Sequence, residues 1–244
     1  MAGVSDEAVC LRQWDWSETS QTVLLFARDY GLVRAIAKGS RRPKSAFSGG
    51  LEAMTRGGIE LIPKREGALA TLTSWDLLEP YASLRRRLPV MHAGLYACDL
   101  VAHAVSVGDR HELLYDALLE LLEAHAELGE MRDDAMLVFH RTLLAEIGLT
   151  PRLDEPPEPD ARVWRFDPER GELVGSDRAR QPPTSESWPI RAETVEALVE
   201  GPAAAREAST LSRANRFCAA FLARKLDADL PVARLVFGPV VRRR

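Results

Sequence analysis

The spacing of apolar residues changes at Pro80, and this change restricts the folds open to the chain. Before Pro80, short runs rich in apolar and aromatic residues alternate with turn residues, which is typical of β-strands. After Pro80, apolar residues recur every three or four positions, which is typical of amphipathic helices. The sequence therefore predicts an α+β protein, with a β domain over residues 1–80 and a helical domain over residues 81–244.

About five short strands are expected in the first part, over residues 8–14, 21–28, 32–38, 59–63 and 68–77. Residues 29–31 and 64–67 are suited to tight turns, and residues 39–50 form a longer loop with three glycines, three serines and a proline. No helical crossover separates the strands. This order indicates a small antiparallel barrel or sandwich.

The second part contains three helical stripes, over residues 84–105, 113–123 and about 133–147, which are expected to pack as a bundle. Gly148 is suited to end the third helix. Residues 150–189 are irregular and proline-rich, with a small hairpin predicted from residues 163–166 and 172–174. Helices resume over about 192–200 and 207–225.

Positive charge is concentrated in one segment, although the net charge of the chain is −4. From Arg28 to Lys44 there are six basic residues and one acid, whereas the segment from Asp109 to Asp134 holds nine acids and two arginines. A chain polarised in this way is able to bind a polyanion with one part while it stays acidic overall.

The composition fits a globular protein, with 46% hydrophobic and 28% charged residues. No apolar run approaches the roughly 20 residues of a membrane-spanning helix, and the N-terminus lacks a signal-peptide pattern. The three cysteines, at positions 10, 98 and 218, are isolated, which is typical of a reducing cytosol. We therefore expect a cytoplasmic protein without a disulfide framework.

Catalytic chemistry finds little support in the sequence. The phosphate-loop, nucleophile-elbow and zinc-protease motifs are absent. The five histidines are scattered over predicted helices, at positions 92, 103, 111, 125 and 140. His92 and His103 are eleven residues apart, too far for one metal ion. We predict no catalytic centre, no cofactor and no metal site.

Two blocks of sequence resemble a known family. Residues 31–45, GLVRAIAKGSRRPKS, are similar to the most recognisable stretch of the RecO recombination mediators, as is the preceding WSETS at residues 16–20. Residues 139–153 are similar to the helix and the G-x-x-P-x-L exit of the same family, here with Gly148, Pro151 and Leu153. The order and spacing of the blocks fit over most of the chain.

The resemblance implies an N-terminal OB-fold barrel followed by an all-α domain with a small irregular hairpin insertion. Many RecO proteins carry a four-cysteine zinc ribbon after the G-x-x-P-x-L exit. Residues 154–190 contain neither cysteine nor histidine here, so that no zinc site of that kind is able to form. Residues 151–190 are therefore expected to be a degenerate, cysteine-free relic of the ribbon.

The resemblance also implies a function. RecO proteins bind single- and double-stranded DNA, anneal complementary strands and help to load recombinase onto strands covered by single-strand-binding protein. The implied partners are DNA, the tail of that protein and the co-mediator RecR, in the nucleoid of a bacterial cytoplasm. No bond is made or broken in this scheme.

Phosphate contacts are expected from the basic segment, because lysine and arginine bind nucleic acid largely independently of sequence. Arg34 and Lys38 lie four residues apart on one predicted strand, so that both side chains point to the same face. The full set of DNA-binding candidates is Arg34, Lys38, Arg41, Arg42, Lys44, Lys64 and Arg65, and residues 85–87 form a further basic run. An ordinary solvated face is the alternative interpretation.

Two further predictions concern aromatic and partner contacts. Phe47, in the loop, is the candidate for base stacking, ahead of Tyr30 and Trp75. The acidic, apolar-ended tail of single-strand-binding protein requires a hydrophobic pocket with a positive rim. That rim is predicted on the last long helix, from Arg213, Arg216, Arg224 and Lys225.

Two other classes of function stay open from the sequence. One is an OB-fold that acts on RNA, because the residues do not separate RNA from DNA. The other is a protein adaptor, in which the helical domain binds partners and the barrel is inert.

Overall fold

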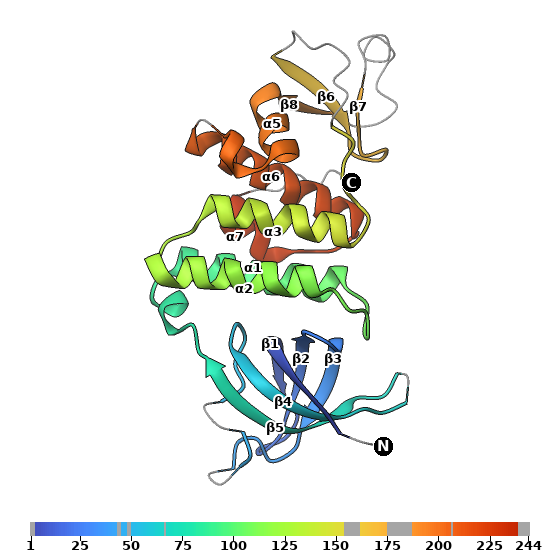
Figure 1. The fold of residues 1–244 in the computed structure, drawn as a ribbon, viewed down its shortest axis with the longest axis vertical. Coiled ribbons are helices and arrows are strands. Elements are labelled where there is room, and N and C mark those ends of the chain that lie inside the picture. Colours follow the sequence, from blue (N-terminus) through green and yellow to red (C-terminus); the bar gives the residue numbers. More distant parts are fainter. Residues whose placement is uncertain are drawn as a thin grey trace. The chain divides into compact units, whose positions relative to one another are not determined.

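The structure is a computed structural model that describes residues 3–42, 45–47, 50–65, 67–153, 162–174, 187–205 and 207–238 (Figure 1). The chain divides into two compact units, Met1–Met131 and Arg132–Arg244.

Five strands form a closed barrel in the first unit, in the order β1-β2-β3-β5-β4. They are β1 (Val4–Asp15), β2 (Gln21–Ala27), β3 (Gly31–Ala37), β4 (Arg56–Ile62) and β5 (Ala70–Glu79). All neighbours are antiparallel except β3 and β5, which run parallel. The predicted OB-like barrel is thereby confirmed.

The barrel core combines small residues with one large ring. Trp75 of β5 is 1% exposed, and the inward residues around it include several alanines. A Cβ atom on Gly57 would lie 2.6 Å from Cε2 of Trp75, so that β4 approaches the ring only because residue 57 is glycine. On the neighbouring position of β4, a Cβ atom on Gly58 would meet nothing within 4 Å.

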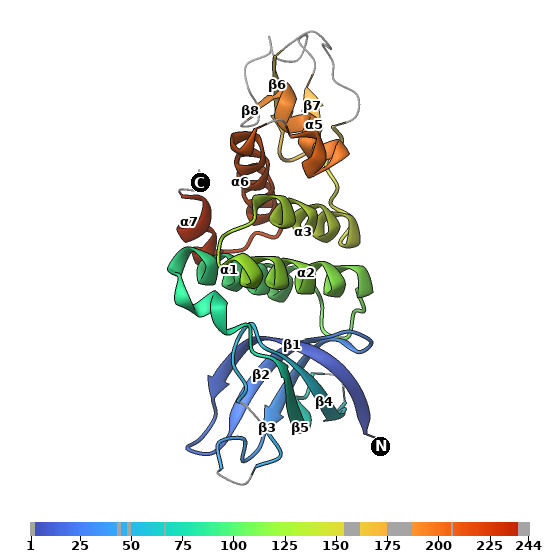
Figure 2. The ribbon, with the colours of Figure 1, turned by 60° about the vertical axis from the view of Figure 1, so that its left-hand side comes forward.

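Two helices, α1 (Leu88–Ala104) and α2 (Glu112–Leu128), belong to the same unit as the barrel and follow a short 3₁₀ turn over Ala82–Arg86 (Figure 2). The rings of Phe26 and Tyr115 pack with centroids 5.8 Å apart. Arg12 of β1 pairs with Asp99 of α1. The helical pattern begins after Pro80, as expected, and the domain boundary at that position stays a prediction.

The second unit combines helices with a small sheet. Its helices are α3 (Asp133–Glu146), α5 (Ala192–Glu200), α6 (Ala208–Lys225) and α7 (Pro231–Phe237), with a 3₁₀ turn at Pro202–Ala204. The sheet has the order β7-β6-β8, with β6 (Val163–Asp167), β7 (Glu172–Val174) and β8 (Trp188–Arg191). The predicted hairpin corresponds to β6 and β7, which pair antiparallel. Residues 154–161 and 175–186 of the predicted insertion lie outside the described residues.

Candidate nucleic-acid interface

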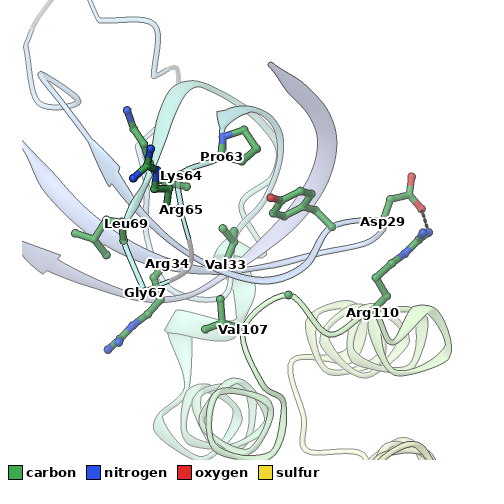
Figure 3. A pocket seen from close by; sticks show the side chains of 14 residues that line it. Asp29, Val33, Arg34, Pro63, Lys64, Arg65, Gly67, Leu69, Val107 and Arg110 are labelled. Atoms are coloured by element: carbon green, nitrogen blue, oxygen red, sulfur yellow. Dashed lines mark hydrogen bonds and ion pairs between the residues drawn. The ribbon is translucent and has the colours of Figure 1, made fainter. Parts of the chain in front are cut away.

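A groove of about 700 Å³ lies beside β3 in the first unit (Figure 3). Its walls come from the β2–β3 turn, the β4–β5 loop and the connection between α1 and α2. We call it the β3 groove, and its lining residues are Asp29, Tyr30, Val33, Arg34, Pro63, Lys64, Arg65, Gly67, Ala68, Leu69, Ala70, Val107, Gly108 and Arg110.

Three of the predicted DNA-binding residues line the β3 groove. Arg34 projects from the outer face of β3, and Lys64 and Arg65 project from the β4–β5 loop (Figure 3). All three side chains are exposed. The parallel pairing of Ala35 with Ala70 brings the end of the β4–β5 loop beside β3, which places these cations together.

One wall of the groove depends on a glycine. Gly31 has a φ of +76°, and a Cβ atom there would lie 2.1 Å from the carbonyl oxygen of Asp109. The amide of Gly108 donates a hydrogen bond of 2.8 Å to the carbonyl of Leu32. The α1–α2 connection therefore rests directly on the start of β3, a close approach that only glycine allows.

Arg110 is a groove residue that sequence reasoning missed. It lies in the acidic segment, and its guanidinium is 3.0 Å from the Glu112 carboxylate and 3.5 Å from that of Asp29 (Figure 3). The signal available in the sequence was its position as one of only two arginines between residues 109 and 134.

The other predicted cations lie at the far end of β3. Lys38 follows the strand and is exposed, as are Arg41 and Arg42. The backbone amide of Arg41 donates to the carbonyl of Thr19 at 3.1 Å, and its guanidinium pairs with Asp15. These contacts hold the start of the β3–β4 loop against the β1–β2 loop. Lys44 lies outside the described residues.

The aromatic candidates differ in accessibility. Phe47 is 9% exposed and belongs to the barrel core beside Trp75, so that little of its ring is available for stacking. Tyr30 lines the β3 groove. The exposed rings are instead those of Trp14 and Trp16, at 46% and 63%. Sequence reasoning missed both, although their spacing around Asp15 at a strand end is visible in the sequence.

The basic run at residues 85–87 has structural contacts. Arg85 donates to the carbonyl of Ala53 at 2.7 Å and lies 3.4 Å from the Glu52 carboxylate. Arg87 donates to the carbonyl of Gly129 at 3.1 Å. These contacts tie the 3₁₀ turn and the start of α1 to their surroundings.

An apolar pocket of about 540 Å³ lies in the second unit. Two of the four predicted rim residues, Arg213 and Arg216, line it. We call it the α6 pocket, and its lining is completed by Val163, Trp188, Pro189, Ile190, Arg191, Thr194, Phe217, Ala220 and Phe237.

The other two predicted rim residues are engaged elsewhere on α6. The Nε atom of Arg224 donates to the Glu169 carboxylate at 2.6 Å, and Lys225 donates to the Glu169 carbonyl at 2.6 Å. The structure therefore does not bring these two residues into the lining of the α6 pocket.

Metal-ligating side chains do not gather in the described parts of the chain, where no group of three or more histidine, cysteine or acidic residues is placed to hold an ion.

Burial raises the pKa of the Cys98 and Cys218 thiols to about 12. Within the same described residues, no helix combines the length and apolar character needed to cross a membrane.

Two family models match the sequence. The model described as Recombination protein O N terminal matches residues 1–81, and the model described as Recombination protein O C terminal matches residues 85–233. The second match alone covers more than half of the chain.

Curated proteins named DNA repair protein RecO are similar to this chain. The one from Salinibacter ruber is 29% identical over 241 residues, or 98% of this chain and 83% of that protein. The one from Anaeromyxobacter sp. (strain K) is 29% identical over 247 residues, or 96% of each chain. The one from Rhodopirellula baltica is 33% identical over 144 residues, which span 59% of this chain and 53% of that protein. Since the two models follow the barrel and the helical part in order, the chain belongs to the recombination protein O (RecO) family of DNA repair proteins.

Proposed function

We propose that this chain binds single- and double-stranded DNA, anneals complementary strands and helps to load recombinase onto strands covered by single-strand-binding protein. Membership of the RecO family supports the role in recombinational repair. The observation that carries the DNA-binding part is the gathering of Arg34, Lys64 and Arg65 along the β3 groove of an OB-like barrel.

The chemistry of the β3 groove suits a polyanion. Exposed guanidinium and ammonium groups bind phosphates through charge and through release of counterions, without reading sequence. In OB-folds, the face of strands 2 and 3 and the β4–β5 loop are common nucleic-acid sites. Because the three cations are exposed, each contact forms and breaks easily, which strand exchange during annealing requires.

The two groups of cations define a path along β3. Lys38 lies four positions after Arg34, a distance of about 13 Å at 3.3 Å per residue. A B-form strand covers this distance in about four nucleotides, at 3.4 Å per step. We therefore propose that the backbone runs from the β3 groove towards Lys38, Arg41 and Arg42.

The α6 pocket is the proposed site for the tail of single-strand-binding protein. Such a tail is acidic and ends in apolar residues. The aromatic rings of Trp188, Phe217 and Phe237 offer the apolar surface, and Arg213 and Arg216 offer the positive charge. Membership of the RecO family supports RecR as a further partner.

Annealing of two complementary oligonucleotides coated with single-strand-binding protein tests the proposal. The native chain should accelerate annealing, and salt should weaken the effect. The triple variant R34Q/K64Q/R65Q should lose most of the acceleration, and its salt slope on single strands should fall by about two, at about 0.7 per phosphate contact. The variant R162Q/R165Q/R234Q removes equal charge from the second unit and should keep the native slope.

Other outcomes would decide between the alternatives. If the native chain neither anneals strands nor binds DNA at low salt, the DNA-repair proposal fails and the adaptor hypothesis gains support. If RNA displaces DNA from the native chain at much lower concentration than unlabelled DNA does, the barrel is an RNA-binding module instead, because such preference requires recognition of the 2′-hydroxyl.

A further inference from the structure

Two tryptophan side chains stand in solvent where β1 ends and the β1–β2 loop begins. Trp14 is 46% exposed and Trp16 is 63% exposed, whereas Trp75 and Trp164 are 1% and 8% exposed. Tryptophan is on average a highly buried residue, because its ring carries a large apolar surface. Two exposed tryptophan rings two residues apart therefore indicate that this surface contacts a binding partner.

The strand register places Trp14 on the outer face of the barrel. Val23 and Leu25 of β2 point into the core, so that the alternate residues Thr22 and Leu24 point outward. Trp14 pairs with Thr22, and Thr22 pairs with Ile36 of β3. The Trp14 ring therefore stands on the same outer face as Arg34.

Only part of this outer face is open. Leu24 and Phe26 are buried, and Phe26 packs on Tyr115 of α2. Towards the β1–β2 loop the face opens, since Ile36 is half-buried and Trp14 is exposed. The open part thus begins at Arg34 and ends at Trp14, next to the loop that carries Trp16.

The β1–β2 loop that carries Trp16 is held by hydrogen bonds. The amide of Trp16 donates to the carbonyl of Ser20 at 3.0 Å, and the amide of Gly39 donates to the hydroxyl of Ser20 at 3.1 Å. The Arg41 guanidinium pairs with Asp15, which lies between the two tryptophans in sequence. These contacts fix the β1–β2 loop, so that few degrees of freedom need to be lost on binding.

We propose that Trp14 and Trp16 form a stacking platform for the unpaired bases of single-stranded DNA. Every base has an aromatic face, so that stacking tolerates any sequence, and the neighbouring cations hold the backbone. Paired bases inside a duplex have no free face and gain nothing from the platform. This inference rests on the proposed DNA-binding function and adds selectivity for single strands to it.

The test compares the full-length variants W14A/W16A and W14F/W16F with the native chain. Three ligands are used: a single-stranded oligothymidine, an abasic strand of equal length, and a duplex. The alanine variant should bind oligothymidine at least about tenfold more weakly, with an unchanged salt slope, because stacking involves no counterion release. Its affinities for the abasic strand and the duplex should stay native. The phenylalanine variant, which keeps aromatic faces, should retain most of the affinity for oligothymidine.

The outcomes separate this inference from the function on which it rests. Native affinity of W14A/W16A for oligothymidine, in a chain that binds DNA through its cations, would overturn the platform and leave the DNA-binding proposal intact. The platform would also be overturned if W14A/W16A lost as much affinity for the duplex and the abasic strand as for oligothymidine. Such losses could not come from stacking on unpaired bases. A native chain that binds none of the three ligands would overturn the DNA-binding proposal and the platform together.

Discussion

Arg28 and Asp116 form a two-point ion pair between the barrel and helix α2. The Nη1 atom of Arg28 lies 2.9 Å from Oδ1 of Asp116, and Nη2 donates to Oδ2 at 3.0 Å. The guanidinium also lies 5.7 Å from the ring centroid of Tyr115. Arg28, the first cation of the basic segment, is thus engaged in contacts within the fold, whereas Arg34 is exposed in the β3 groove.

This difference makes Arg28 and Arg34 a matched pair. R28Q should lower the free energy of unfolding by about 0.2–1 kcal/mol, the usual range for an exposed ion pair, and should leave DNA affinity native. R34Q should leave stability native and reduce the salt slope on single strands by about 0.7. Urea unfolding and fluorescence anisotropy at several salt concentrations measure both quantities. A salt slope that falls equally in both variants would contradict the assignment of Arg28 to the fold.

A second matched pair lies on α6. Arg216 is exposed and lines the α6 pocket, whereas Arg224 contacts Glu169. R216E should weaken binding of an acidic peptide with an apolar C-terminus at least about tenfold, because it places like charge beside the peptide. R224E should bind that peptide with native affinity. Isothermal titration calorimetry gives both constants, and equal weakening in the two variants would remove the pocket from the proposal.

The fold was largely predictable because its elements have distinct apolar periods. The alternation in β3 and the three-to-four spacing in α2 depend on local sequence alone. The strand β8 was not predicted, since Trp188-Pro189 lacks a strand pattern and pairs with β6 only through tertiary structure. The short helix α7 was missed for the same kind of reason, as seven residues give little periodicity.

The site was less predictable than the fold. Arg34 and Lys38 follow from alternation within one strand. The grouping of Arg34 with Lys64 and Arg65 depends on the parallel pairing of β3 with β5, which local sequence does not specify. Phe47 lies in a loop by sequence, but its pairing with Trp75 takes it into the core.

Gly57 and Gly58 give a prediction about the barrel core. G57A should destabilise the protein by about 1–3 kcal/mol, because the new methyl group would overlap the buried Trp75 ring. G58A places the methyl group in open space on the other face of β4 and should be neutral or slightly stabilising. Urea unfolding measures both. Equal destabilisation would show that strand conformation, and not contact with Trp75, explains the effect.

The cysteines should be unreactive in the folded protein. Cys10, Cys98 and Cys218 are buried, and burial raises the pKa of each thiol, to about 12 for Cys98 and Cys218. Because the thiolate is the reactive form, a disulfide reagent at pH 8 should modify less than one thiol per native chain within minutes. All three should react after unfolding in guanidinium. Rapid reaction of one thiol in the native chain would show that its helix or strand opens locally.

His140 should make stability depend on pH. The Nδ2 group of Asn215 donates to the carbonyl of Asp133 at 2.8 Å, which leaves Oδ1 of Asn215 as an acceptor for Nδ1–H of His140 at 3.0 Å. Burial lowers the pKa of His140 from 6.5 to about 4, and the hydrogen bond to Asn215 opposes this shift only in part. Between pH 6.5 and about 4, His140 is therefore neutral in the folded state and protonated in the unfolded chain.

The direction of the effect follows from the depressed pKa of His140. Above pH 6.5 the imidazole is neutral in both states, and its contribution to stability is complete. Between pH 6.5 and about 4 the unfolded chain binds a proton that the folded state excludes, so that stability falls by about 1.4 kcal/mol per pH unit from this group.

H140Q keeps a donor near Asn215 and removes the titration. Its free energy of unfolding, measured in urea from pH 4 to 7.5, should be lower than native at neutral pH and should fall less steeply on acidification. Parallel curves for the two proteins would mean that His140 takes up its proton in the folded state as readily as in the unfolded chain.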